Sequence, residues 1–319
     1  MNAPERLPVL PVAPAVPTPS ALPGTGAMAG AGTVPRKLLV GLIGSGIQRS
    51  LTPAMHEEEA RHHGLKLHYQ LIDLDVTGRT VQALPGLIEA ARVMGFAGLN
   101  ITYPCKQAVI PLLDELSDEA RAMGAVNTVV FRDGRAIGHN TDGWGWAWGF
   151  KRTLPEARLG RVVLLGAGGA GSAIAHAALR LGVQALVVVD SDAARATQLA
   201  QDLSAHYPAA RISDSTDVAQ ALAGANGLIH ATPTGMDKLP GLPLDAALLR
   251  RDLWVSEIVY FPLDTALLKA ARAAGCATVD GGTMAAGQAI GAFELFTGCE
   301  PDAARIDAHL RRMLAERQG

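Results

Sequence analysis

Apolar, strand-like runs alternate with helical segments along most of the chain. In the first part, the strand-like runs cover residues 36–44, 65–73 and 96–102, and the helical segments cover 52–64, 80–95 and 104–116. Residues 125–139 then read as a β-hairpin, because they contain Asp133-Gly134, a dipeptide favoured in two-residue hairpin turns. This alternation predicts an N-terminal α/β domain.

The alternation begins afresh near Asp142. A connecting helix is expected over 142–154, and residues 161–182 read as strand, glycine turn and helix. Further short apolar strands follow at 185–190, 227–232, 254–260 and 277–280, separated by helical segments. Regular βα repetition of this kind is typical of a parallel, doubly wound sheet, so a second, Rossmann-type domain is predicted.

The last two segments, 284–298 and 301–318, are helical and no strand follows them. We expect them to pack back on the first domain. The predicted division is therefore a catalytic domain formed by residues 37–141 and 283–319, with a dinucleotide-binding domain over 142–282.

Residues 1–36 differ from the rest of the chain in being rich in Pro, Ala and Gly and nearly free of charge. Proline recurs too often for the apolar helix of a signal peptide. We interpret the segment as a disordered, partly polyproline-like tail. The alternative is that the start codon has been assigned too far upstream.

Composition narrows the class of protein. Of the 319 residues 49% are hydrophobic and 18% charged, and the net charge is -2. This balance gives no basic surface for nucleic acid or for an anionic membrane. Three cysteines form no CxxC pair, and no apolar run reaches the length of a membrane helix, about 18 residues. We therefore expect a cytoplasmic protein with reduced thiols and neither nucleic-acid nor membrane partners.

One glycine-rich segment points to a dinucleotide site. It fits G-x-G-x-x-G, directly after an apolar strand and directly before a helix. Glycine permits the tight turn and the close approach of backbone to a pyrophosphate, which the free N–H groups of the helix then bind. The alternative is a glycine turn in a fold that has lost its ligand. The cofactor is expected to contact Gly166, Ala167, Gly168, Gly169 and Ala170.

Asp190 indicates which dinucleotide binds. It ends the next predicted strand, where an acidic residue accepts hydrogen bonds from the adenosine ribose. A 2′-phosphate there would face Asp190 and Asp192, and one pair of unit charges 4 Å apart costs about 4 kcal/mol at an effective dielectric near 20. Arg195 could offset part of that cost, or it could lie on a solvated helix face. The balance predicts NAD as the cofactor.

Lys106 is unusual because it follows a Thr-x-Pro step at the end of an uncharged, strand-like run. The segments around it resemble motifs of the shikimate dehydrogenase family, in the family's order and spacing from about Lys37 to the C-terminus. The matching segments are Ser50-Leu51-Thr52-Pro53 with His56, Asn100 to Lys106, Gly124 to Thr128, Asn140 to Gly143, Gly166 to Ala170, and Gln288.

The resemblance implies a reaction and its residues. Family members interconvert a hydroxyl of a cyclic carboxylate and the corresponding ketone by passing a hydride to nicotinamide. By resemblance, Lys106 and Asp142 form the catalytic pair. Burial disfavours an ammonium group and a neighbouring carboxylate favours it, so the sequence leaves the protonation state of Lys106 open. The alternative for this pair is a purely structural ion pair.

The resemblance also implies the binding residues. Ser50 and Thr52 would hold the substrate carboxylate, although they could equally cap the helix before Pro53. Neutral side chains would hold the ring hydroxyls, namely Thr102, Asn127 and Gln288. Further cofactor contacts are implied for Thr232, Val259 and Gly282.

Two departures from the NADP-dependent biosynthetic pattern favour another branch. Asp190-Ser191-Asp192 stands where that branch has Asn-Arg-Thr, and Ser50-x-Thr52 stands where it has Ser-x-Ser. Both resemble NAD-dependent quinate/shikimate dehydrogenases. We therefore expect an enzyme that uses NAD with quinate and shikimate, as a monomer or homodimer. The rivals are an NADP-dependent biosynthetic shikimate dehydrogenase and a non-catalytic metabolite sensor.

No metal site is predicted. His56, Glu59 and His63 share one helix face, but no ligand from another segment accompanies them, so a solvated polar face is the expectation.

Overall fold

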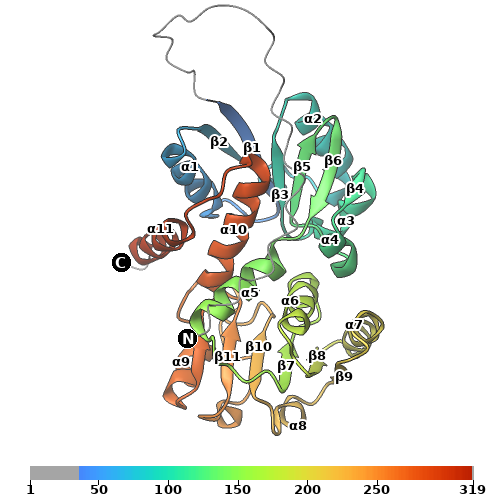
Figure 1. Ribbon diagram of the computed structural model, residues 1–319, viewed down its shortest axis with the longest axis vertical. Coiled ribbons are helices and arrows are strands. Elements are labelled where there is room, and N and C mark those ends of the chain that lie inside the picture. Colours follow the sequence, from blue (N-terminus) through green and yellow to red (C-terminus); the bar gives the residue numbers. More distant parts are fainter. Residues whose placement is uncertain (1–35, 318–319) are drawn as a thin grey trace, which may run out of the picture. The chain divides into compact units, whose positions relative to one another are not determined.

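The computed structural model describes residues 36–317, which contain two six-stranded sheets and their covering helices (Figure 1). The tail predicted for residues 1–36 lies outside the described residues, apart from Arg36. The mixed α/β class and the Rossmann-type second sheet are confirmed.

The first sheet is mixed and has the order β2-β1-β3-β5-β6-β4. Its strands are β1 (Lys37–Gly44), β2 (Lys66–Asp73), β3 (Gly98–Ile101), β4 (Glu115–Leu116), β5 (Thr128–Arg132) and β6 (Arg135–His139). Its helices are α1 (Thr52–His62), α2 (Leu84–Val93), α3 (Cys105–Ala108) and α4 (Asp118–Met123). The predicted hairpin is confirmed as β5 and β6, because Asp133 and Gly134 both have positive φ, 52° and 75°, as the turn requires.

The second sheet is entirely parallel and has the order β12-β11-β10-β7-β8-β9. Its strands are β7 (Arg161–Leu165), β8 (Ala185–Val189), β9 (Arg211–Ser215), β10 (Gly227–His230), β11 (Trp254–Glu257) and β12 (Ala277–Val279). Helices α5 (Asp142–Thr153), α6 (Gly169–Arg180), α7 (Ala193–His206), α8 (Val218–Leu222) and α9 (Ala266–Ala273) connect and cover them. The strand order reverses between β7 and β10, and ligands of such sheets bind beyond the carboxyl ends of the strands at that point.

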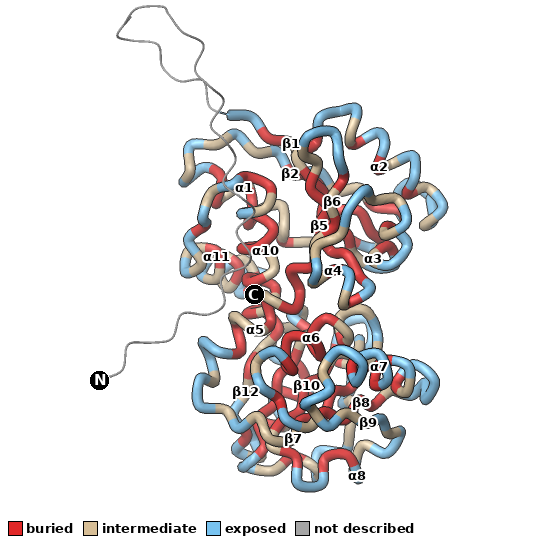
Figure 2. The backbone as a smooth tube through the Cα atoms, turned by 45° about the vertical axis from the view of Figure 1, so that its right-hand side comes forward, coloured by how far each residue is buried: buried red, intermediate tan, exposed pale blue. Residues whose placement is uncertain are grey.

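The four central strands of the second sheet, β7, β8, β10 and β11, are buried along almost their whole length (Figure 2). Val162 and Leu164 of β7 belong to one buried cluster, whereas Val163 and Leu165 belong to another. A strand covered on both faces needs no polar positions, so its sequence reads as one continuous apolar run. Within residues 36–317, no helix combines the length and the apolar character that crossing a membrane requires.

The C-terminal helices α10 (Gly281–Thr297) and α11 (Ala303–Glu316) pack on α1, as predicted, and α10 also packs along α5 (Figure 1). Small residues allow the approach of α5 and α10. A Cβ on Gly145 would lie 2.5 Å from the backbone nitrogen of Gln288, and one on Gly287 would lie 2.5 Å from the Cα of Gly145. This crossing fixes the first residue of α5 relative to the middle of α10.

The helix predicted over 104–116 is wrong. Helix α3 ends at Ala108, a 3-10 turn covers Ile110–Leu112, and Glu115–Leu116 pair with β6. Pro111 explains the break, because proline lacks an N–H and disfavours helical geometry at the preceding residue. Helix α4 and strands β4 and β9 were not predicted at all. Strand β9 escaped notice because it is a largely exposed edge strand, with the polar sequence RISDS.

The expectation of a solvated face on α1 is also wrong. His56 and Glu59 are each 1% exposed. Arg305 of α11 donates to both carboxylate oxygens of Glu59, at 2.7 and 2.6 Å, and the N–H of Asp302 donates to it at 2.8 Å. Burial raises the pKa of Glu59, but these donors outweigh it and lower the pKa below its usual value. This face of α1 is therefore part of a buried, hydrogen-bonded contact with α11.

His56 makes stability dependent on pH. Burial lowers its pKa to about 4, against a smaller opposing effect of its hydrogen bond to the carbonyl of Thr52. An unfolded histidine titrates near 6.5, so the unfolded chain binds the proton more readily and stability falls as pH falls. We expect the free energy of unfolding to lose about 2 kcal/mol through this residue between pH 7 and pH 5, levelling off below about pH 4.

Urea denaturation of the full chain at pH 7 and pH 5 checks this expectation. The His56→Gln variant cannot titrate and should lose less stability over that interval than the unmodified protein. His62→Gln is the matched control, since it removes a histidine of the same helix whose side chain is 47% exposed, and the loss of stability assigned to His56 should persist in this variant. Equal pH dependence in both variants would contradict the assignment.

Candidate functional site

Lys106 lies where a buried strand gives way to a short helix. Strand β3 ends at Ile101, and the N–H of Thr102 donates to the carbonyl of Ile43 at the end of neighbouring β1. Lys106 follows as the second residue of α3, and its carbonyl accepts from the N–H of Val126 at 2.9 Å. The lysine is therefore fixed at the carboxyl edge of the first sheet, with its side chain 22% exposed.

The side chain of Lys106 pairs with the carboxylate of Asp142. The distance from Nζ to Oδ2 is 2.5 Å, and the Asp142 side chain is 7% exposed. Asp142 is the first residue of α5, and its N–H donates to the side-chain oxygen of Asn140 at 3.0 Å. Two residues 36 positions apart thus form one ion pair, which the predicted catalytic role requires.

Asn127 holds the other oxygen of Asp142. Its Nδ2 donates to Asp142 Oδ1 at 2.8 Å and to Thr141 Oγ1 at 3.0 Å. Its Oδ1 accepts from the N–H of Thr141 at 2.8 Å and from the hydroxyl of Thr128 at 2.9 Å. Both amide hydrogens are therefore committed to protein atoms, so a substrate hydroxyl would have to replace one of these bonds.

A buried polar chain continues behind Asn127. Asn100 Nδ2 donates to the hydroxyl of Thr128 at 3.1 Å, and the hydroxyl of Tyr69 donates to Asn100 Oδ1 at 2.7 Å. Burial raises the pKa of Tyr69 well above its usual value, so the phenol keeps its proton and remains a donor. The chain fixes which way the amide of Asn100 points, and with it the hydroxyl of Thr128 that serves Asn127.

The remaining predicted substrate residues are placed around this cluster without joining it directly. Ser50 Oγ donates to Thr52 Oγ1 at 3.1 Å, and the N–H of Thr52 donates to Ser50 Oγ at 3.3 Å. Between residues 36 and 317, no hydrogen bond joins either hydroxyl to Lys106 or Asp142. Gln288 is connected through its backbone, whose carbonyl accepts from Thr141 Oγ1 at 3.2 Å.

The capping alternative for Ser50 and Thr52 is only partly realised. The N-cap of α1 is Leu51, which makes no capping hydrogen bond, and Pro53 lies in the first turn. The only local backbone contact of the two hydroxyls, among the described residues, is that of Ser50 with the N–H of Thr52.

The glycine turn after β7 has the shape that a dinucleotide needs. Gly166 has φ of 104°, and a Cβ on Gly171 would lie 1.9 Å from the Gly166 carbonyl oxygen, so neither position accepts a side chain. A Cβ on Gly168 or Gly169 would meet nothing within 4 Å, so the outer side of the turn is open. The first N–H groups of α6 have no partner within the helix. The turn therefore fits a pyrophosphate.

Asp190 lies against this turn. Its Oδ2 accepts from the N–H of Ala167 at 2.7 Å and its Oδ1 from the N–H of Asp192 at 2.9 Å. Partial burial raises the pKa of Asp190, but these N–H groups outweigh it and lower the pKa, so the group is a carboxylate at neutral pH. Arg195 is 68% exposed and pairs with Asp192 at 3.2 Å, as the solvated alternative expects.

The other predicted cofactor residues lie on loops beyond β10 and β11 and at the start of α10. A Cβ on Gly166 would lie 3.1 Å from Cγ2 of Thr232, and one on Gly281 would lie 2.4 Å from the carbonyl oxygen of Val259. Gly282 is next to Gly281 and is buried. The turn therefore adjoins Thr232, and the start of α10 adjoins Val259.

Sequence reasoning gave no role to His230 and Glu257, which end β10 and β11. The sequence did contain a signal for them, because each is an ionisable residue near the end of an apolar, strand-like run. The same signal drew attention to Lys106 and Asp190.

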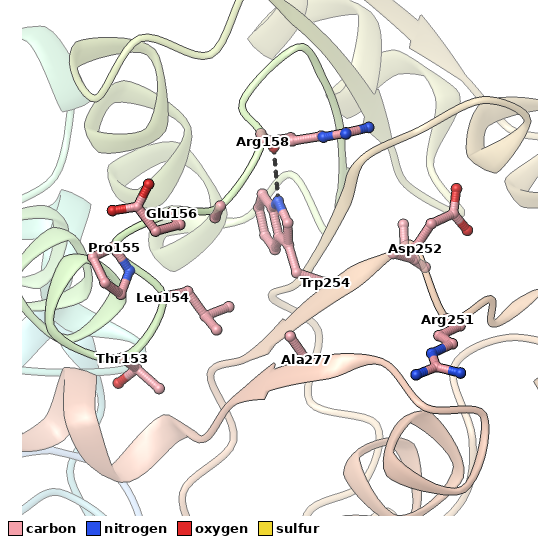
Figure 3. Close-up of a pocket in the computed structure, with 11 residues that line it drawn as sticks. Thr153, Leu154, Pro155, Glu156, Arg158, Arg251, Asp252, Trp254 and Ala277 are labelled. Carbon is pink, nitrogen blue, oxygen red and sulfur yellow. Dashed lines mark hydrogen bonds between the residues drawn. The ribbon is translucent and has the colours of Figure 1, made fainter.

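A surface hollow lies at the opposite edge of the second sheet (Figure 3). It includes Trp254 and Ala277, the first residues of β11 and β12, and segments 153–158 and 251–253. None of the predicted site residues lines it, and ligands of doubly wound sheets bind at the carboxyl edge. Within residues 36–317, no three His, Cys, Asp or Glu side chains are grouped to hold a metal ion.

Family models match two parts of the chain. Residues 42–129 match the shikimate dehydrogenase substrate binding domain. Residues 138–248 match the C-terminal domain of alanine dehydrogenase/PNT. The first match contains Lys106 and Asn127, and the second contains the glycine turn and Asp190.

Individual relatives cover most of the chain. A shikimate dehydrogenase (NADP(+)) of Streptomyces avermitilis is 56% identical over 277 residues, which are 86% of this chain and 95% of the relative. A quinate/shikimate dehydrogenase (NAD(+)) of Corynebacterium glutamicum is 47% identical over 272 residues, 84% of this chain and 96% of the relative. The solved structure of quinate dehydrogenase from Corynebacterium glutamicum in complex with NAD is similar with a TM-score of 0.81 and 46% identity, covering 86% of this chain and 98% of that one.

Proposed function

Because the chain belongs to the shikimate dehydrogenase family, we propose that it is the NAD-dependent quinate/shikimate dehydrogenase that its sequence predicts. The reaction is reversible hydride transfer between quinate or shikimate and NAD, giving 3-dehydroquinate or 3-dehydroshikimate. The observation that carries the cofactor choice is the carboxylate of Asp190, 2.7 Å from the N–H of Ala167 in the glycine turn. A 2′-phosphate at the adjoining ribose would meet this charge at close range.

The ion pair supplies the acid–base chemistry. A dinucleotide held at the glycine turn would supply the hydride acceptor or donor. As the hydride leaves carbon, the O–H bonding electrons form the C=O bond and the hydroxyl proton passes to the lone pair of a neutral Lys106 Nζ. In the reverse direction the Lys106 ammonium returns that proton to the carbonyl oxygen. Asp142 stays a carboxylate and holds Nζ, and Asn127 holds Asp142.

Lys106 is the more accessible member of the pair. Its side chain is 22% exposed, whereas that of Asp142 is 7% exposed. Solvent therefore reaches the lysine more readily than the aspartate.

Variants of Ser50 and Thr52 test which acids the enzyme oxidises and how it binds them. Steady-state oxidation of both quinate and shikimate is expected, and removing either hydroxyl should raise the KM for the acid. Losing one such hydrogen bond to a charged group typically costs about 1–3 kcal/mol, or roughly 5–150-fold. Thr52→Ser keeps a hydroxyl and should retain most of the affinity. Thr80→Ala removes an exposed hydroxyl outside the predicted site and is the neutral control.

One competing function has specific support. The Streptomyces avermitilis relative is an NADP(+) enzyme at 56% identity, which favours an NADP-dependent biosynthetic shikimate dehydrogenase. Turnover of shikimate with no detectable turnover of quinate would support that rival and contradict the proposal. A metabolite sensor would bind either acid without turnover, but the intact Lys106–Asp142 pair argues against it.

The proposed setting is the cytoplasm, with the enzyme acting as a monomer or homodimer on small-molecule substrates. All three cysteines are free thiols, two of them buried, which agrees with a reducing compartment.

A further inference from the structure

Two ionisable side chains of the second sheet are fully enclosed without belonging to the predicted site. His230 is 0% exposed and Glu257 1% exposed. They are paired in register as the last residues of β10 and β11, and Nδ1 of His230 lies 2.8 Å from Oε1 of Glu257. The pair therefore lies at the carboxyl edge of the sheet, beside the point where the strand order reverses.

Each side chain also bonds to the loop that follows its strand. Nε2 of His230 lies 2.5 Å from the hydroxyl oxygen of Thr232. Oε1 of Glu257 accepts from the N–H of Val259 at 2.9 Å, and Oε2 accepts from the hydroxyl of Thr265 at 3.0 Å. Every polar atom of the pair is thus used, and two of its partners, Thr232 and Val259, are residues implied to contact the cofactor.

The two loops adjoin the rest of the dinucleotide site. A Cβ on Gly166 would lie 2.6 Å from the carbonyl oxygen of Ala231 and 3.1 Å from Thr232. A Cβ on Gly281, the first residue of α10, would lie 2.4 Å from the carbonyl oxygen of Val259. The pair therefore supports the loops that adjoin the glycine turn on one side and α10 on the other.

The pair also restricts the hydroxyl of Thr232. A carboxylate only accepts, so the hydrogen on Nδ1 of His230 points to Glu257. In a neutral ring, Nε2 is then an acceptor and takes the hydroxyl hydrogen of Thr232, whose oxygen also accepts from the N–H of Thr234 at 3.3 Å. The Thr232 oxygen then faces a ligand only as an acceptor, which fits an amide or hydroxyl donor of the nicotinamide nucleoside.

Stability alone is a weak reason for such a pair. Withdrawing two ionisable groups from water is costly, and apolar side chains of similar size often stabilise a fold as well or better. We propose that His230 and Glu257 are a positioning pair that fixes Thr232 and Val259 against the nicotinamide end of the dinucleotide. The inference depends on a nicotinamide dinucleotide being bound and not on the choice between NAD and NADP.

The test compares two ligands that share the adenosine diphosphate ribose half. Kinetics on the full chain first show which coenzyme it prefers. If it prefers NAD, the dissociation constants of NADH and ADP-ribose are measured. If it prefers NADP, the two ligands are NADPH and 2′-phospho-ADP-ribose instead. His230→Asn should weaken binding of the reduced coenzyme at least tenfold and change ADP-ribose binding less than twofold. His230→Gln, whose amide reaches further, should restore part of the loss.

His176→Asn is the matched control. His176 is also buried in the second sheet's helical cover and bonds to the hydroxyl of Tyr207 at 3.0 Å, away from the carboxyl edge. This variant should lower the melting temperature without changing the ratio of the two dissociation constants. Should His230→Asn fail to fold, Glu257→Gln and Thr232→Val test the same ratio. Equal weakening of both ligands, or of neither, would overturn the proposal.

Discussion

Replacing Lys106 by alanine is expected to lower turnover by orders of magnitude while dinucleotide affinity stays nearly unchanged. General acid–base catalysis by a positioned side chain typically contributes about 10²–10⁴-fold. Lys106 is in α3 beside the first sheet, whereas the glycine turn and Asp190 follow strands β7 and β8 of the second, so we expect coenzyme affinity to depend little on the lysine. Steady-state kinetics and NADH titration of the same variant measure the two effects separately.

Asp142→Asn should also reduce turnover severely. The two residues act as one unit through the 2.5 Å contact, so the double variant should be little worse than either single variant. Lys151→Ala removes an exposed lysine from α5 and is the control for an unspecific loss of positive charge. Near-normal turnover in Lys106→Ala would refute the catalytic assignment.

The unmodified protein is expected to prefer NAD to NADP by at least about 100-fold in kcat/KM, or roughly 2.7 kcal/mol. A carboxylate beside the adenosine ribose can accept hydrogen bonds from the ribose hydroxyls but repels a 2′-phosphate, and this is the role we propose for Asp190. One pair of unit charges 4 Å apart costs about 4 kcal/mol at a dielectric near 20, which leaves room for solvent screening and partial compensation by Arg195. Initial rates with each coenzyme at saturating shikimate measure the preference.

Three variants separate Asp190 from its surroundings. Asp190→Asn should lower kcat/KM for NAD and reduce the preference for NAD over NADP. Ser191→Arg should reduce that preference further. Asp214→Asn removes a charge of the same sign from β9 and should leave the preference unaltered. Efficient use of NADP by the unmodified protein would show that Asp190 does not govern the ribose, and the NAD assignment would lose its main support.

The sequence predicted the doubly wound sheet because strands buried on both faces carry an unmistakable apolar pattern. Lys106 and Asp190 stood out for the same reason, since each is a charge at the end of such a strand. Elements without that signal escaped prediction. Strand β4 has only two residues and β9 is polar and exposed, so neither needed an apolar pattern.

Long-range partners were the other limit of sequence reasoning. The burial of Glu59 depends on Arg305, 246 residues further along, and no local pattern shows that contact. The pair of His230 and Glu257 depends likewise on the register of β10 against β11. Family motifs located the candidate catalytic residues, but only the structure revealed that Asn127 already spends both amide hydrogens on protein atoms.

That full set of bonds changes how Asn127 can discriminate between substrates. A ring hydroxyl that binds to Asn127 replaces a hydrogen bond that Asn127 already makes within the protein, so the net gain in binding free energy is small. If the hydroxyl is missing, no amide hydrogen of Asn127 is left without an acceptor. When an analogue that lacks this hydroxyl binds, Asn127 keeps its hydrogen bonds to Thr141 and Asp142. We therefore expect tolerance at this ring position, and selection among ring hydroxyls would have to come from the side chains of Thr102 and Gln288, the other neutral residues that the family resemblance implies for them.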